Sequence, residues 1–172
     1  MGLVKNIFLV GPMGAGKTTI GRQLATMLRM EFADSDREIQ GRTGVDISTI
    51  FDFEGEEGFR KREKLAIEDL TNGEGQVLAT GGGAVLDPDN RRNLSSRGVV
   101  VYLTCSPQQQ YERTIRDKNR PLLQTEDPLA RLEALMAERD PLYQSIADFI
   151  VSTENRSAQA VAKEIVRKLD EY

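Results

Sequence analysis

GPMGAGKT, at residues 11–18, matches the phosphate-binding loop pattern G-x-x-x-x-G-K-T. The segment before it, residues 7–10, is apolar and β-prone, which is typical of a buried strand. After it, apolar residues recur at helical spacing at Ile20, Leu24 and Leu28. Glycines allow a tight turn, and the first N–H groups of a helix have no internal partner. The sequence therefore predicts a strand–loop–helix unit that binds phosphate.

Two side chains complete this predicted site. Lys17 can reach the β- and γ-phosphates of a nucleotide, and the Thr18 hydroxyl can bind Mg²⁺. The loop alone does not say what happens to the phosphate, because hydrolysis, transfer to a small molecule and switching all use it.

The composition is that of one ordinary globular domain spanning residues 1–172, with 39% hydrophobic and 29% charged residues. No apolar run approaches the roughly 20 residues that cross a bilayer. We expect no cleavable signal, because the N-terminus runs straight into the first strand. A net charge of −4 argues against a general nucleic-acid surface. These features fit a cytoplasmic protein.

The chain contains no histidine, and Cys105 is its one cysteine. This excludes Ser-His and Cys-His nucleophile pairs, imidazole metal ligands and an intrachain disulfide. A proton acceptor would therefore be a carboxylate. The 23 basic residues comprise 16 arginines and 7 lysines. Because arginine suits bidentate anion binding, anion sites are expected to be local.

Predicted strands alternate with predicted helices along the chain. We expect strands at residues 7–10, 31–33, 77–79, 99–103 and 149–151. This alternation predicts an α/β fold, with a five-stranded parallel sheet that is covered by helices on both faces. In such folds ligands bind beyond the carboxyl ends of the strands.

Several helix boundaries can also be predicted. Ser35 with Glu38 fits a capping box. Short helical pieces are expected within 41–58, followed by a longer helix. Another helix is expected over 129–138, ending before Asp140-Pro141.

Two further helices have a clear start, and one segment resembles a loop. Asp87-Pro88 and Ser106-Pro107 each combine a capping residue with proline at the first helical position. Gln109 would complete a second capping box. The polar segment 117–128 contains two prolines and is interpreted as an exposed loop, and a last helix is expected around Val161.

Chemistry-bearing residues follow two of these strands. Asp34 and Asp36 lie where the γ-phosphate is expected, so one could hold Mg²⁺ through water and the other could take a proton from an acceptor hydroxyl. Helix capping is the alternative use of such acids. Three glycines, residues 81–83, can present N–H groups to a ligand, although a flexible turn has the same composition. The aspartate of a standard Walker B motif is absent there.

Taken together, these residues resemble the shikimate kinase family over nearly the whole chain. The matching pieces are GPMGAGKT at 11–18, DSD at 34–36, GEEGFRKRE at 55–63, TGGG at 80–83, DKNRPLL at 117–123 and ERDPLY at 138–143. The resemblance implies a single P-loop kinase domain with a mobile lid at about 112–128 and an acceptor-binding segment at about 34–63. It also implies a monomer.

The implied reaction is ATP-dependent phosphorylation of the 3-hydroxyl of shikimate, a step of chorismate and aromatic amino acid biosynthesis. By position, Lys17, Asp36 and Arg120 would be catalytic. ATP would be bound by Gly14, Ala15, Gly16, Lys17, Thr18, Thr19, Arg113, Arg120 and Arg156. Shikimate would be bound by Asp36, Arg60, Gly81, Gly82, Gly83 and Arg139. Mg²⁺ would be bound by Thr18 and, through water, by Asp34. Any one of these arginines, taken alone, also fits an ordinary surface residue.

Other functions remain open on the residues. Gluconate kinases and nucleoside monophosphate kinases share the expected fold but match fewer of these motifs. A GTP-dependent switch is a different class. DFEG at 52–55 fits D-x-x-G, yet no strand precedes it and the guanine signature N-K-x-D is absent.

Overall fold

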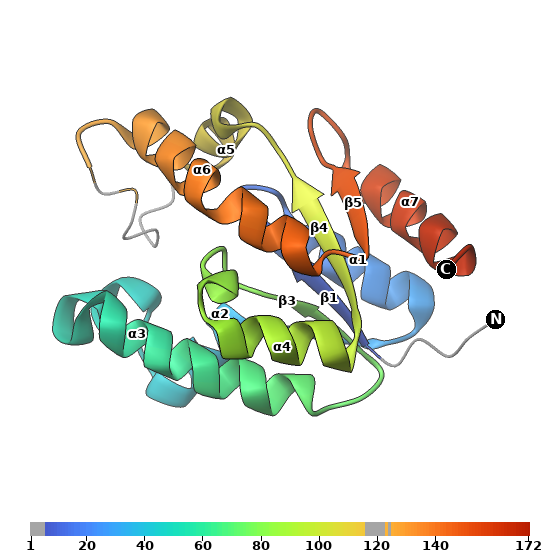
Figure 1. Ribbon diagram of the computed structural model, residues 1–172, viewed down its shortest axis with the longest axis horizontal. Coiled ribbons are helices and arrows are strands. Elements are labelled where there is room, and N and C mark those ends of the chain that lie inside the picture. The colour runs from blue at the N-terminus through green and yellow to red at the C-terminus, as the bar shows by residue number, and fades with distance from the viewer. Residues whose placement is uncertain (1–5, 116–122, 124) are drawn as a thin grey trace.

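A computed structural model describes residues 6–115, 123 and 125–172 (Figure 1). At its centre lies a five-stranded sheet in the order β2-β3-β1-β4-β5, in which every pair of neighbours is parallel. The strands are β1 (Asn6–Val10), β2 (Glu31–Asp34), β3 (Gln76–Ala79), β4 (Val99–Thr104) and β5 (Phe149–Ser152). The predicted α/β class and the five-stranded parallel sheet are confirmed.

Helices connect the strands and cover both faces of the sheet (Figure 1). They are α1 (Lys17–Leu28), α2 (Ser35–Thr43), α3 (Ile47–Thr71), the short 3₁₀ helix η1 (Ala84–Leu86), α4 (Pro88–Arg97), α5 (Pro107–Thr114), α6 (Pro128–Ile146) and α7 (Ala158–Asp170). Within the described residues, none of these helices combines the length and apolar character needed to span a membrane.

The alternation of side chains along the strands builds a core on each side of the sheet. Ile7 and Leu9 of β1 face a cluster formed with α1 and α7. Phe8 and Val10 face the opposite cluster, formed with side chains of α3, α4 and α6. Successive strand residues point to opposite faces, so a fully apolar strand has to be buried on both sides. This explains why the four apolar residues of β1 are buried; the polar Asn6 is buried too, with its side-chain amide donating to the carbonyls of Gly73 and Arg97.

The helix α6 is longer than the sequence predicted. It continues through Pro141 to Ile146, although proline removes a helical hydrogen bond and costs about 3 kcal/mol. The burial of Tyr143, which is 1% exposed, offsets this cost. Its ring lies 4.8 Å from that of Tyr102, and its hydroxyl donates a hydrogen bond to the carbonyl of Gly82. Burying an aromatic ring contributes a free energy of similar size, about 1.5–3 kcal/mol.

One further local expectation was wrong. Ser35 does not cap α2; Asp34 does, accepting hydrogen bonds from the backbone N–H groups of Asp36 and Arg37. Ser35 is instead buried, and its hydroxyl oxygen accepts a hydrogen bond from Gly81 N. The short helical pieces expected within 41–58 are confirmed: the region holds the end of α2 and the first part of α3, which bends at Gly55 (φ 71°) and then continues as the longer helix that was also expected. The starts of α4 and α5 are confirmed, with Asp87 and Ser106 as caps.

Candidate active site

The phosphate loop joins β1 to α1, as predicted. Gly14 (φ 80°) and Gly16 (φ 88°) adopt left-handed backbone conformations, which glycine adopts without strain. Gly16 stands at the N-terminus of α1, and no side chain caps this end. The first N–H groups of α1 therefore remain available for an anion. Ala15 between these glycines is buried in the core, so only its backbone can serve a ligand.

The Lys17 side chain lies back over the loop. Its ammonium donates hydrogen bonds to the carbonyls of Gly11, at 2.7 Å, and Pro12, at 2.8 Å. Lys17 is 8% exposed, and a buried cation favours an anionic partner strongly. Phosphate oxygens placed against the loop would lie within reach of this ammonium.

Thr18 and Asp34 bring two oxygen ligands together. The Thr18 hydroxyl donates to Oδ2 of Asp34 at 2.8 Å, and both residues line the pocket described below. Hydroxyl and carboxylate oxygens suit Mg²⁺, which keeps several of its waters and takes few protein ligands. Among the described residues, no group of three or more histidine, cysteine or acidic side chains could hold a metal ion. The pair therefore fits a magnesium ion that is held mainly by water and phosphate.

Across the pocket, the glycines after β3 leave room for two acidic side chains. A Cβ atom added to Gly81 would lie 2.8 Å from Oδ1 of Asp36 and 3.0 Å from Oε2 of Glu63. A Cβ atom added to Gly83 would collide with the guanidinium of Arg60. These contacts place Asp36, Glu63 and Arg60 around the glycines; the strand ends predicted this neighbourhood for Asp36, and the family resemblance implied it for Arg60.

Glu63 is a site residue that the sequence analysis missed. It is 1% exposed, and one of its oxygens pairs with Arg60 at 2.9 Å. Burial raises the pKa of Glu63 to about 7; the nearby Arg60 opposes this rise, and Asp36 adds to it. Glu63 follows Arg60 by three residues on one helix, a spacing that places the two side chains on the same face. That spacing, within the quoted motif 55–63, was the available signal.

Arg139 enters this region from α6. It is 4% exposed, and one of its terminal nitrogens would lie 3.5 Å from a Cβ atom added to Gly82. Its Nε has no hydrogen-bond partner among the described residues, and neither has Oε2 of Glu63. Buried polar atoms are normally paired, so a polar ligand at the glycines would satisfy groups that the chain leaves open.

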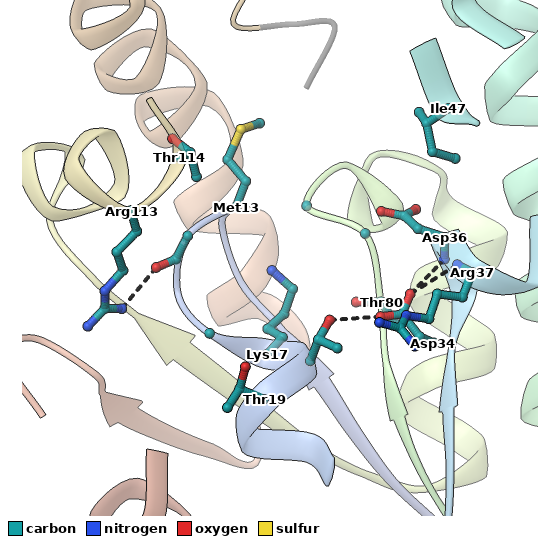
Figure 2. Close-up of a pocket in the computed structure, with 15 residues that line it drawn as sticks. Met13, Lys17, Thr19, Asp34, Asp36, Arg37, Ile47, Thr80, Arg113 and Thr114 are labelled. Carbon is teal, nitrogen blue, oxygen red and sulfur yellow. Dashed lines mark hydrogen bonds between the residues drawn. The ribbon is translucent and has the colours of Figure 1, made fainter. Parts of the chain in front are cut away.

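A pocket of about 360 Å³ connects these features (Figure 2). Figure 2 shows Arg113 and Thr114 on one side of Lys17, and Asp36 and Ile47 on the other. The lining residues are Met13, Gly14, Gly16, Lys17, Thr18, Thr19, Asp34, Asp36, Arg37, Ile47, Thr80, Gly81, Gly82, Arg113 and Thr114. The pocket therefore has the phosphate loop in its middle, an acidic end and an end at α5.

The remaining predicted residues lie at or beyond its edge. Arg60, Gly83 and Arg139 adjoin the acidic end without lining this pocket. Arg156 turns toward α7, where it pairs with Glu164 at 2.9 Å and donates to the carbonyl of Ser152. Arg120 lies outside the described residues, as do the other residues of 116–122 and residue 124 of the predicted lid.

The lining also contains residues that the sequence analysis did not assign. Met13 and Thr80 lie within quoted motifs, so their position in the chain could have indicated them. Arg37 and Ile47 fall within the expected acceptor-binding segment and Thr114 within the expected lid, but none was singled out, because their placement against the phosphate loop depends on the tertiary fold. No local pattern marks these three.

Comparison with known proteins gives consistent results. The family model described as "Shikimate kinase" matches residues 13–170. The shikimate kinase of Vibrio campbellii is 60% identical over 167 residues, covering 97% of each chain. That of Photobacterium profundum is 59% identical over 167 residues, covering 97% of this chain and 95% of its own.

Solved structures agree with these relatives. Shikimate kinase from Acinetobacter baumannii in complex with shikimate superposes with a TM-score of 0.96 at 49% identity, covering 98% of this chain and 94% of the other. Shikimate kinase from Aquifex aeolicus gives a TM-score of 0.84 at 35% identity, with 96% of both chains covered.

Proposed function

This chain belongs to the shikimate kinase family, and from that premise we propose that its pocket transfers the γ-phosphoryl group of ATP to the 3-hydroxyl of shikimate. The observation that carries the proposal is the arrangement of the pocket. The phosphate loop lies in its middle, with Asp36 on one side (Figure 2). The glycines 81 and 82 line the same pocket, and a Cβ atom added to Gly81 would lie 2.8 Å from Oδ1 of Asp36. A donor phosphate and an acceptor hydroxyl can therefore meet next to Asp36.

Each part of the substrate finds a chemically suitable partner. The carboxylate of shikimate fits the guanidiniums of Arg60 and Arg139, because arginine binds carboxylates with two parallel hydrogen bonds. The ring hydroxyls fit the backbone of residues 81–83 and the carboxylate of Asp36. The phosphates of ATP fit the N–H groups of residues 14–19 and the ammonium of Lys17.

The transfer itself needs positioning more than covalent chemistry, since the transition state of phosphoryl transfer is loose. Asp36 orients the 3-hydroxyl and accepts its proton as the new O–P bond forms. The bond between the γ-phosphorus and the bridging oxygen breaks, and ADP leaves. Lys17 stabilises negative charge on the phosphates. Thr18 and Asp34 would hold Mg²⁺, which supplies charge neutralisation of the phosphate oxygens.

Other parts of the proposal rest on the family resemblance. Arg120, on a lid at about 112–128, is proposed to stabilise the transferring group, and Arg113 and Arg156 to contact the nucleotide. The segment at about 34–63 is proposed to bind the acceptor. The protein is proposed to act as a cytoplasmic monomer, which sedimentation of the purified protein at several concentrations would test.

The test of the proposed reaction is a coupled ADP-release assay with ATP and Mg²⁺. It compares shikimate, gluconate, a panel of nucleoside monophosphates and no acceptor. We expect strong release with shikimate alone. Release with a different acceptor would overturn the assigned substrate, and slow release independent of any acceptor would overturn the kinase reaction.

A further inference from the structure

The end of the pocket at α5 has to receive the rest of the nucleotide. If the γ-phosphate faces Asp36, as the proposed transfer requires, the ribose and base leave the phosphate loop on the opposite side of Lys17, where Arg113 and Thr114 lie (Figure 2). That inference rests on the proposed function. The loop after β5, residues 153–157, lies next to this end, because Arg113 donates to the Thr153 carbonyl at 3.0 Å and to the Gly14 carbonyl at 2.9 Å.

One buried side chain fastens this loop to α5. The Gln109 amide donates to Oδ1 of Asn155 at 2.8 Å and accepts from the Asn155 backbone N–H at 2.9 Å. Gln109 is 8% exposed, so these hydrogen bonds lie away from water. Asn155 has a left-handed backbone (φ 52°), a conformation that asparagine and aspartate tolerate better than most residues. The loop is thus held in one defined shape.

Two more contacts point to the same junction. Glu154 accepts hydrogen bonds from the backbone N–H and the hydroxyl of Ser106, both at 2.8 Å, at the N-cap of α5. Gln109 and Arg113 are four residues apart on α5 and so share one helix face. Through Gln109 that face contacts the loop 153–157. Through Arg113 it contacts the same loop and also Gly14 of the phosphate loop.

We propose that Gln109 and Asn155 are a positioning pair for the nucleotide, holding residues 153–157 and Arg113 where the base of ATP packs. The pair does not touch the reacting atoms. It sets nucleotide affinity by pre-organising the base end of the pocket, since a loop that is already ordered loses less entropy on binding.

The first test replaces the pair's buried member and a neighbouring glutamine. Gln109→Ala removes both hydrogen bonds to Asn155. Gln108→Ala is the matched control, because Gln108 is an exposed glutamine on the same helix turn, and its side-chain hydrogen bond within the described part of the chain goes to Glu112. We expect Gln109→Ala to weaken ADP binding, measured by calorimetry. The KM for ATP should rise about five- to thirty-fold, which corresponds to the loss of one or two neutral hydrogen bonds. The KM for shikimate and kcat should stay within about twofold.

A double-mutant cycle that introduces a carboxylate at each position tests the pair itself. An amide can donate or accept after a flip, so Gln109→Glu and Asn155→Asp should each keep a hydrogen bond and most of the ADP affinity. The double variant places two carboxylates in contact and should lose far more affinity than the sum of the single changes.

Unchanged ADP affinity in Gln109→Ala relative to Gln108→Ala would overturn the proposal. So would an equal loss in kcat, in shikimate KM and in ADP affinity, because that pattern indicates a general structural role. Since ADP binding is measured without an acceptor, a failure of the wild-type protein to phosphorylate shikimate would count against the proposed function alone.

Discussion

The hydroxyl of Thr18 donates a 2.8 Å hydrogen bond to Oδ2 of Asp34, joining the first turn of α1 to the end of β2. The other oxygen of Asp34 caps α2. One carboxylate thus connects the phosphate loop to the segment that carries Asp36. This link places the proposed magnesium site and the proposed proton acceptor at a fixed separation.

Replacing Asp34 by Asn should weaken magnesium binding while the fold is retained. Asparagine caps a helix about as well as aspartate, so the substitution removes mainly the charge. We expect the free Mg²⁺ concentration for half-maximal activity to rise about tenfold, as for a charge-assisted contact worth roughly 1–2 kcal/mol. The measurement is activity against free Mg²⁺ at saturating ATP and shikimate.

Asp87→Asn is the matched control, because Asp87 caps α4 in the same way outside the pocket. Its magnesium dependence should equal that of the wild type. An equal rise in both variants would show that capping, not magnesium binding, explains the effect at Asp34.

Asp36→Asn should nearly abolish turnover. A positioned general base contributes about 10²- to 10⁴-fold to a rate, and asparagine cannot accept the proton of the 3-hydroxyl. We expect kcat to fall by at least about 100-fold. The affinity for ADP, measured by calorimetry, should be unchanged, because Asp36 lies on the opposite side of Lys17 from the α5 end (Figure 2). Near-normal turnover would rule out the role assigned to Asp36.

Arg139→Ala should mainly weaken shikimate binding. Loss of a bidentate, buried partner for the carboxylate should raise the KM for shikimate about 10- to 100-fold, equivalent to roughly 1.5–3 kcal/mol. Arg139→Lys should recover little, since an ammonium does not reproduce the planar fork of guanidinium. Initial rates over a matrix of shikimate and ATP concentrations separate the two KM values.

Arg131→Ala, two turns earlier on the same helix α6, is the control and should leave both KM values near those of the wild type. A large rise in the KM for ATP, with an unchanged KM for shikimate, would contradict the assignment of Arg139.

Alanine substitutions at three glycines should have graded effects. A Cβ atom at Gly81 would lie within 3.0 Å of Asp36 and Glu63, whereas one at Gly82 would meet its nearest neighbour at 3.4 Å. One at Gly41, inside α2, would meet nothing within 4 Å. Gly81→Ala should therefore reduce kcat/KM for shikimate most and Gly82→Ala less. Gly41→Ala should leave it unchanged and stabilise the fold by about 0.5–1 kcal/mol. Kinetics and thermal unfolding of the three variants test this order.

Glu63 should make stability depend on pH. Because its pKa is raised to about 7 in the folded state from 4.5, the folded protein holds this proton more tightly than the unfolded chain. The stability that protonated Glu63 contributes is fully present below pH 4.5 and is lost as the pH rises through about 7. The free energy of unfolding, measured with denaturant between pH 4.5 and 8, should show this loss of stability in the wild type and not in Glu63→Gln. Parallel curves would contradict a buried, titrating Glu63.

Local patterns predicted much of this protein. The glycine spacing of residues 11–18 predicted the phosphate loop, because that backbone shape needs glycine whatever surrounds it. Apolar β-prone segments predicted the strands, and Asp87-Pro88 predicted the start of α4, since capping depends only on neighbouring residues. The resemblance of several motifs to one family indicated the acceptor, which none of these local patterns identifies alone.

The tertiary structure decided what depends on contacts between distant segments. Ser35 resembled a helix cap, but it is buried against Gly81, and Asp34 caps α2 instead. Pro141 was expected to lie beyond the end of a helix, but α6 continues because Tyr143 packs on Tyr102, 41 positions away in the chain. Glu63 became part of the site only because its helix brings it to residues 36 and 81. Sequence alone determines which backbone shapes and chemical groups are available; the packing free energy of distant residues determines which of them meet.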